Sequence, residues 1–70
     1  MNSIEVQVQS ILTAITKRYV MTDEKIPPEV LALKDEVMDI FVKAKQETDS
    51  EKLRQFERRL AEIHEIITTQ

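Results

Sequence analysis

The sequence has no cysteine and no glycine, and it has only two prolines, one histidine, one tyrosine and two phenylalanines. Without cysteine the chain can form neither disulfides nor thiolate metal sites, and a single histidine excludes a histidine-rich metal site. Tight hairpins and phosphate-binding loops rely on glycine for backbone positions with positive φ. P-loop and Rossmann motifs require glycine at fixed spacing, so those nucleotide-binding enzyme classes are excluded. Such a composition is typical of an all-α chain that needs no cofactor.

Seventy residues form one domain at most, so we assign residues 1–70 to a single helical domain. A chain of this length buries only about 60% of the surface that it exposes when unfolded. Small domains without disulfides or metals are usually stabilised by helix packing or by oligomerisation. Ten basic and thirteen acidic residues give a net charge of −3 without long runs of one sign. No segment is therefore basic enough to predict a phosphate-binding surface.

The beginning of the chain lacks the features of a secretory signal. Residues 1–5 (MNSIE) carry neither a positive segment nor the start of a 7–15-residue apolar core. No apolar run approaches the roughly 20 residues of a membrane span. We therefore expect a soluble, cytoplasmic protein that does not enter a membrane.

The central element of the chain is a helix predicted over residues 28–46. Pro27 disfavours helical backbone at Ile26, and Pro28 fits the first turn of a helix, where a missing N–H costs nothing. At about 100° per residue the segment carries two apolar stripes. The broad stripe consists of Val30, Leu33, Val37, Ile40, Phe41 and Ala44, and the second consists of Leu31, Met38 and Val42. A helix with about half of its surface apolar is expected to contact more than one neighbour.

Residues 3–21 fit two patterns. The segment from Ile4 to Gln9 alternates apolar and polar residues, which favours a strand. Helical spacing extends over four turns, through Ile4, Val8, Ile11, Leu12, Ile15 and Tyr19. We predict a helix with Asn2 or Ser3 as its N-cap, because a lone strand would have no partner. The pattern alone leaves residues 1–10 open between helix, strand and mobile arm, and Val6, Val20 and Met21 lie off the main stripe.

Residues 50–67 have the clearest amphipathic pattern. Their apolar residues repeat at intervals of three and four, through Leu53, Phe56, Leu60, Ile63 and Ile67. Thr48 and Glu51 have the spacing of a capping box, with Asp49 and Ser50 as alternative caps. Residues 68–70 are expected to fray. The whole pattern predicts a three-helix up-down bundle with helices at about 3–21, 28–46 and 50–67, and a helical-hairpin dimer is the alternative architecture.

An apolar stripe left over after the core is formed usually marks an interaction surface. We therefore predict a non-enzymatic protein–protein interaction module or regulator. Its partner would be another protein or a second copy, with a homodimer favoured. The predicted partner-binding residues are Leu31, Met38, Val42, Tyr19 and Met21.

Two other functional classes have weaker support in the sequence. Arg54, Arg58 and Arg59 could contact phosphates in a small dimeric nucleic-acid-binding regulator, but glutamates lie among them and would repel those phosphates. His64, at the border of the last apolar stripe, has no nucleophile nearby in sequence, so an enzyme with a histidine base and a small-molecule substrate ranks last. Three carboxylates, Asp35, Glu36 and Asp39, lack the glycine and the alternating ligands of a calcium loop. No metal, catalytic or cofactor-binding residue is predicted.

Overall fold

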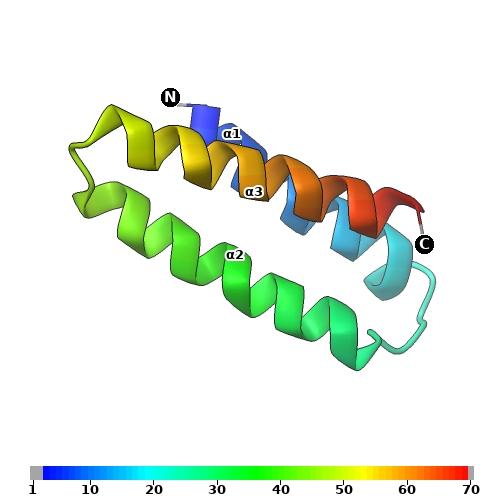
Figure 1. Ribbon diagram of the computed structural model, residues 1–70. Coiled ribbons are helices and arrows are strands. Elements are labelled where there is room, and N and C mark those ends of the chain that lie inside the picture. The colour runs from blue at the N-terminus through cyan, green and yellow to red at the C-terminus, as the bar shows by residue number, and fades with distance from the viewer. Residues whose placement is uncertain (1–2, 70) are drawn as a thin grey trace.

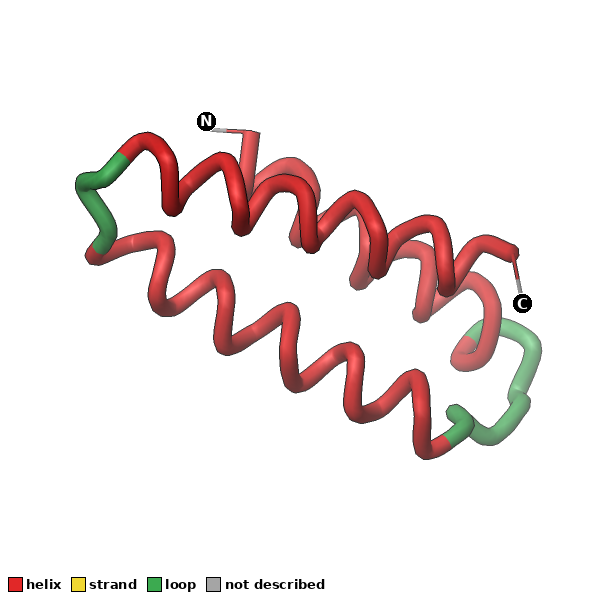
Figure 2. The backbone as a smooth tube through the Cα atoms, in the orientation of Figure 1, coloured by secondary structure: helices red, strands yellow, loops and turns green. Residues whose placement is uncertain are grey.

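The computed structural model describes residues 3–69 and is an all-α up-down bundle of three helices (Figure 1). Helix α1 spans Ser3–Ile15 and continues into a π-helical segment, η1, at Thr16–Val20. Helix α2 spans Pro28–Gln46 and helix α3 spans Ser50–Thr69. The two loops lie at opposite ends of the bundle, so α1 and α3 run parallel to each other and antiparallel to α2 (Figure 2).

The predicted helix is confirmed over the alternating segment of α1, and the predicted boundaries are confirmed for α2 and for the start of α3, whereas the expected fraying is wrong for Thr68 and Thr69. The alternating segment from Ile4 to Gln9 is helical, because the 3–4 spacing places its apolar residues against two other helices. Thr68 and Thr69 belong to α3 instead of fraying. Their hydroxyls donate to carbonyls one turn earlier, Thr68 to His64 at 3.0 Å and Thr69 to Glu65 at 2.9 Å. The possible cap Asn2 lies outside the described residues.

The core is built from the three predicted stripes. Its buried side chains are Ile4, Val8, Ile11, Ile15, Tyr19, Val30, Val37, Ile40, Leu60, Ile63 and Ile67. Leu33, Phe41 and Ala44 of α2 and Leu53 and Phe56 of α3 are partly buried around them. Every apolar residue of the broad α2 stripe therefore contributes to the core or to its edge, which leaves the second stripe for the surface.

The π-helical segment keeps Tyr19 in the core. Its hydrogen bonds span five residues, with the Met21 N–H donating to the Thr16 carbonyl at 2.9 Å and the Glu24 N–H to the Tyr19 carbonyl at 2.8 Å. A wider turn advances less than 100° per residue, so Tyr19 stays over the same face as Ile15. The turn that follows η1 ends at Asp23, whose φ of 57° lies in the left-handed region that aspartate tolerates.

The three helices do not pack equally closely. Helix α1 packs most extensively against α3 and much less against α2. Polar contacts support the α1–α3 pair, since the Ser3 hydroxyl donates to Glu57 Oε1 at 2.5 Å and the Gln7 amide donates to the Glu57 carbonyl at 3.1 Å. The looser packing of α1 and α2 leaves a groove between these two helices.

Candidate interaction surface

The second apolar stripe of α2 lies at the surface of the folded chain. Leu31 is 45% exposed, Met38 41% and Val42 56%. All three are on one side of the helix, because their spacings of seven and four residues correspond to whole turns. We call these three residues the α2 stripe. The fold therefore leaves a row of three aligned apolar side chains about half exposed on α2.

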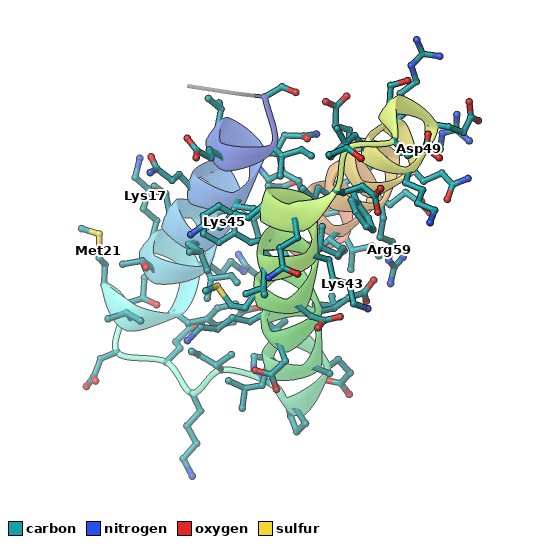
Figure 3. All side chains as sticks on the ribbon, turned by 90° about the vertical axis from the view of Figure 1, so that its left-hand side faces the viewer. Lys17, Met21, Lys43, Lys45, Asp49 and Arg59 are labelled. Atoms are coloured by element: carbon teal, nitrogen blue, oxygen red, sulfur yellow. The ribbon has the colours of Figure 1, made fainter. Side chains whose placement is uncertain are left out.

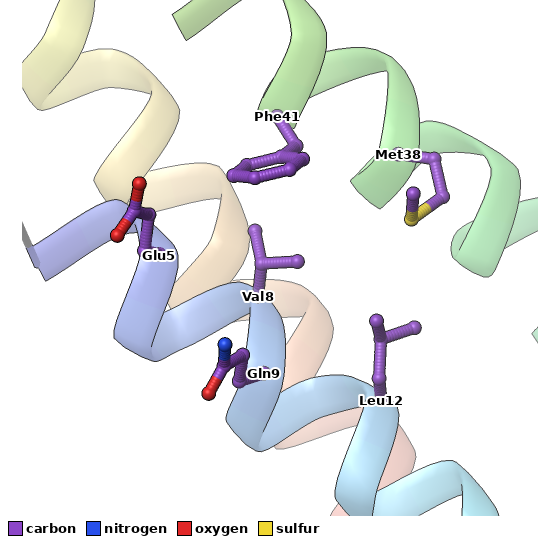
Figure 4. Close-up of a pocket in the computed structure, with 6 residues that line it drawn as sticks. All are labelled: Glu5, Val8, Gln9, Leu12, Met38 and Phe41. Carbon is purple, nitrogen blue, oxygen red and sulfur yellow. The ribbon is translucent and has the colours of Figure 1, made fainter. Parts of the chain in front are cut away.

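A groove beside the α2 stripe extends this apolar surface toward α1. It has a volume of about 340 Å³ and is lined by Glu5, Val8, Gln9 and Leu12 of α1 and by Met38 and Phe41 of α2. Figure 4 shows Val8 and Leu12 rising from α1 toward Phe41 and Met38 on α2. Met38 therefore belongs to both features, and the stripe and the groove form one continuous surface.

Charged residues border this surface at its edges. The Lys45 ammonium lies 4.4 Å from the centre of the Phe41 ring, within the range of a cation–π contact. Figure 3 shows Lys45 on the side of α2 that faces α1, and Lys43 on the side that faces α3. Lys43 forms an ion pair with Asp39 at 2.9 Å, and both side chains are exposed. Lysine and aspartate at the rim with an apolar centre resemble the usual anatomy of a protein interface.

Of the five predicted partner-binding residues, Met38 lines the groove and Leu31 and Val42 complete the α2 stripe, whereas Tyr19 and Met21 belong to neither feature. Tyr19 is only 5% exposed, because the π-helical turn keeps it over the core, and its predicted role as a surface anchor is therefore wrong. Met21 is 73% exposed but follows η1 at the loop end of the bundle. Figure 3 shows Met21 on the outer side of this end. The candidate surface therefore keeps Leu31, Met38 and Val42, whereas Tyr19 is buried and Met21 does not line the groove.

The three arginines of the nucleic-acid alternative are not equivalent in the structure. Arg59 forms two hydrogen bonds with Glu36 of α2 and lies 4.0 Å from Glu62. The Glu36 carboxylate hydrogen-bonds to the Arg59 guanidinium, and this raises the pKa of the arginine further. Arg54 and Arg58 are exposed on α3. The predicted phosphate-binding set therefore reduces to Arg54 and Arg58, because Glu36 engages the guanidinium of Arg59.

The remaining candidates for chemistry lie on the surface without forming a site. His64 is exposed, because the core face of α3 consists of Leu60, Ile63 and Ile67 and does not include it. Among residues 3–69 there is no group of three or more histidines, cysteines, aspartates or glutamates that could hold a metal ion. None of the helices in the described part of the chain is both long and apolar enough to cross a membrane.

The α1 wall of the groove is the part of the surface that sequence reasoning missed. Which side of α1 faces α2 depends on how the helices pack, and the helical pattern of α1 alone does not decide it. One signal in the sequence could have indicated it, namely the absence of charged residues between Glu5 and Lys17.

In comparisons with known proteins, the chain matches no protein-family model, no curated protein and no solved structure.

Proposed function

We propose that this protein is a non-enzymatic protein–protein interaction module that binds a second copy of itself through the α1–α2 face. The observation that carries this proposal is the alignment of Leu31, Met38 and Val42 on one side of α2, each 41–56% exposed, beside an apolar groove. Aligned apolar residues next to a groove are typical of interaction surfaces, whereas scattered ones are not. A regulatory role in the cytoplasm would suit a small module that has no cysteine and so forms no disulfides.

A second copy is the occupant favoured by the size of the face and by its two-sided shape. The bundle measures 39 × 22 × 19 Å, so a face along its long axis matches the roughly 800 Å² that each partner contributes to a standard interface. The surface also combines a ridge, the α2 stripe, with a groove. A two-fold pairing uses the same patch on both copies, so that each ridge can contact the groove of the other copy. Such pairing would enlarge the buried core of a short chain, which on its own buries a smaller fraction of its surface than a longer chain does.

Nucleic-acid binding has less support. Arg59 is engaged by Glu36, and exposed Arg54 and Arg58 lie among glutamates on α3. Binding to a polyanion depends on a basic surface that releases counterions. The chain as a whole is acidic, with a net charge of −3.

Sedimentation equilibrium over a hundredfold range of protein concentration tests the proposed self-association. We expect a wild-type dimer and a folded monomer for Met38→Asp, because a dimer would bury the new carboxylate without a partner. Ala61→Asp is the matched control, since Ala61 is exposed on α3, and it should dimerise like wild type. Circular dichroism of each variant checks that the helices persist.

Two outcomes contradict the proposal. A wild-type protein that stays monomeric over the whole range has no self-interface of useful affinity. A Met38→Asp variant that stays dimeric shows that the interface lies elsewhere. If Met38→Asp unfolds, Val42→Asp is the variant to use, because Val42 is more exposed than Met38 in the monomer. The proposal then requires that Val42→Asp stays folded and does not dimerise.

A further inference from the structure

Helix α1 has an exposed side without charge. The eleven residues between Glu5 and Lys17 include no charged residue, whereas α2 carries seven and α3 carries eight. The exposed members of this segment are Val6, Gln9, Ser10, Thr13 and Thr16, and we call them the neutral strip. Exposed helix surfaces in this protein are otherwise rich in lysine, arginine, aspartate and glutamate. Depletion of charge is the compositional signal of the centre of a protein interface.

The neutral strip adjoins the groove described above. Gln9 belongs to both, and Thr13 follows it by one helical turn on the same side of α1. Met38 lines the opposite wall of the groove from α2, as Figure 4 shows. The α1–α2 face therefore combines the neutral strip of α1, which begins after Glu5 at one end of the groove, with the apolar stripe of α2.

We infer that the neutral strip of α1 covers the α2 stripe of a second copy, an inference that rests on the proposed self-association. A two-fold axis parallel to the helices places α1 of one copy opposite α2 of the other. Because α1 and α2 are antiparallel within each copy, every neighbouring pair of helices across this contact is antiparallel as well. The four helices then form the up-down-up-down arrangement of common four-helix bundles. In this arrangement both copies of the α2 stripe are buried against uncharged side chains.

The charges at the rim favour this axis over one perpendicular to the helices. A perpendicular axis would lay α2 on α2 and bring the same helix edges together, so that the edges that carry Asp35 in the two copies would meet. Like charges placed opposite each other at an interface disfavour the pairing. With the parallel axis, the edge of α2 that carries Asp35 lies instead beside α1 of the other copy. Helix α1 continues into η1, which contains the positively charged Lys17. Opposite charges at that rim support the pairing of α1 with α2.

The first test places a single charge in the neutral strip. Thr13→Glu should weaken dimerisation by at least about tenfold, because the contact would bury an unpaired carboxylate. The monomer should fold normally, since the new carboxylate lies four residues before Lys17 and forms a favourable helix pair with it. Ala61→Glu on α3 is the matched control and should leave the dimerisation constant within about twofold of wild type. Sedimentation equilibrium measures the constants, and circular dichroism verifies the helices.

The second test identifies which helices meet. Thr13→Glu and Met38→Lys chains should each be monomeric alone, whereas their equimolar mixture should form a heterodimer in which the two new charges face each other. A wild-type dimer that Met38→Asp dissociates but Thr13→Glu does not would overturn this inference and leave the proposed function standing. A mixture that stays monomeric would also overturn the pairing of α1 with α2. A monomeric wild-type protein would refute the proposed function itself.

Discussion

Arg59 on α3 and Glu36 on α2 form a two-pronged ion pair that ties these helices together. Arg59 Nε donates to Glu36 Oε2 at 2.5 Å, and Arg59 Nη2 donates to Glu36 Oε1 at 2.9 Å. Parallel hydrogen bonds of this kind fix geometry more tightly than a simple ion pair does. The two side chains remain 39% and 37% exposed, so solvent screens part of the interaction. The ion pair joins α2 to α3, whereas the candidate surface lies between α2 and α1.

This pair predicts a pH dependence of stability. The hydrogen bonds from Arg59, together with its positive charge, hold the pKa of Glu36 below its ordinary value, against the opposing effects of partial burial and of Asp39. A carboxylate with a lowered folded-state pKa stabilises the fold above the unfolded-state pKa of about 4.3. Its contribution is lost as the pH falls through the lower, folded-state value. Wild type should therefore be more stable than Glu36→Gln near neutral pH, by no more than about 1 kcal/mol because the pair is exposed.

Urea unfolding at pH 7, 5 and 3 measures this difference. The gap between wild type and Glu36→Gln should be nearly constant from pH 7 to 5 and should shrink toward pH 3. Asp39→Asn is the control, because Asp39 pairs with Lys43 within α2 and has no bond to α3. A gap that widens as the pH falls would contradict the lowered pKa of Glu36.

We expect the largest loss of stability from a substitution of Leu60, at the centre of α3. Its side chain is fully buried, in contact with a core contributed by all three helices. Leu60→Ala should lower the free energy of unfolding by about 2–5 kcal/mol, because it removes buried apolar contacts and leaves a cavity. In a domain with a small core, this loss is large enough to unfold much of the protein at room temperature.

The same substitution at an exposed leucine provides the control for Leu60. Leu31 is 45% exposed, so Leu31→Ala should cost less than about 1 kcal/mol when the protein is dilute enough to be monomeric. Thermal and urea unfolding followed by circular dichroism give both values. Equal losses for the two variants would contradict the assignment of Leu60 to the core.

The fold follows from the sequence where local chemistry decides it. Pro27 and Pro28 determine where α2 begins, and the 3–4 spacing of apolar residues determines which face of each helix is buried. Packing between distant segments decides the rest. The partner of Arg59 lies 23 residues away on another helix, and no local pattern indicates that Glu36 will face it.

The candidate surface was predictable only in its α2 half. A second apolar stripe on α2 was visible from helical spacing, and the structure leaves its three residues exposed. The α1 half depends on the side of α1 that turns toward α2, which the packing of α3 against α1 determines. Helical spacing already placed Tyr19 on the apolar face of residues 3–21, and its second assignment as a surface anchor is excluded by its burial in the core.

The start of α3 provides a prediction that separates sequence pattern from structure. Thr48 and Glu51 have the spacing of a capping box, yet it is Asp49 Oδ1 that accepts the Glu51 N–H at 2.9 Å. Asp49 is thus the N-cap of α3, and its negative charge also lies favourably at the positive end of the helix dipole.

Asp49→Ala should therefore destabilise the protein by about 1 kcal/mol, within the 0.5–2 kcal/mol usual for a lost cap. Thr48→Ala should change the free energy of unfolding by less than about 0.5 kcal/mol, as expected of an exposed position. Urea unfolding of both variants decides between the two caps, since a larger loss for Thr48→Ala than for Asp49→Ala would restore the capping box that the sequence pattern indicates.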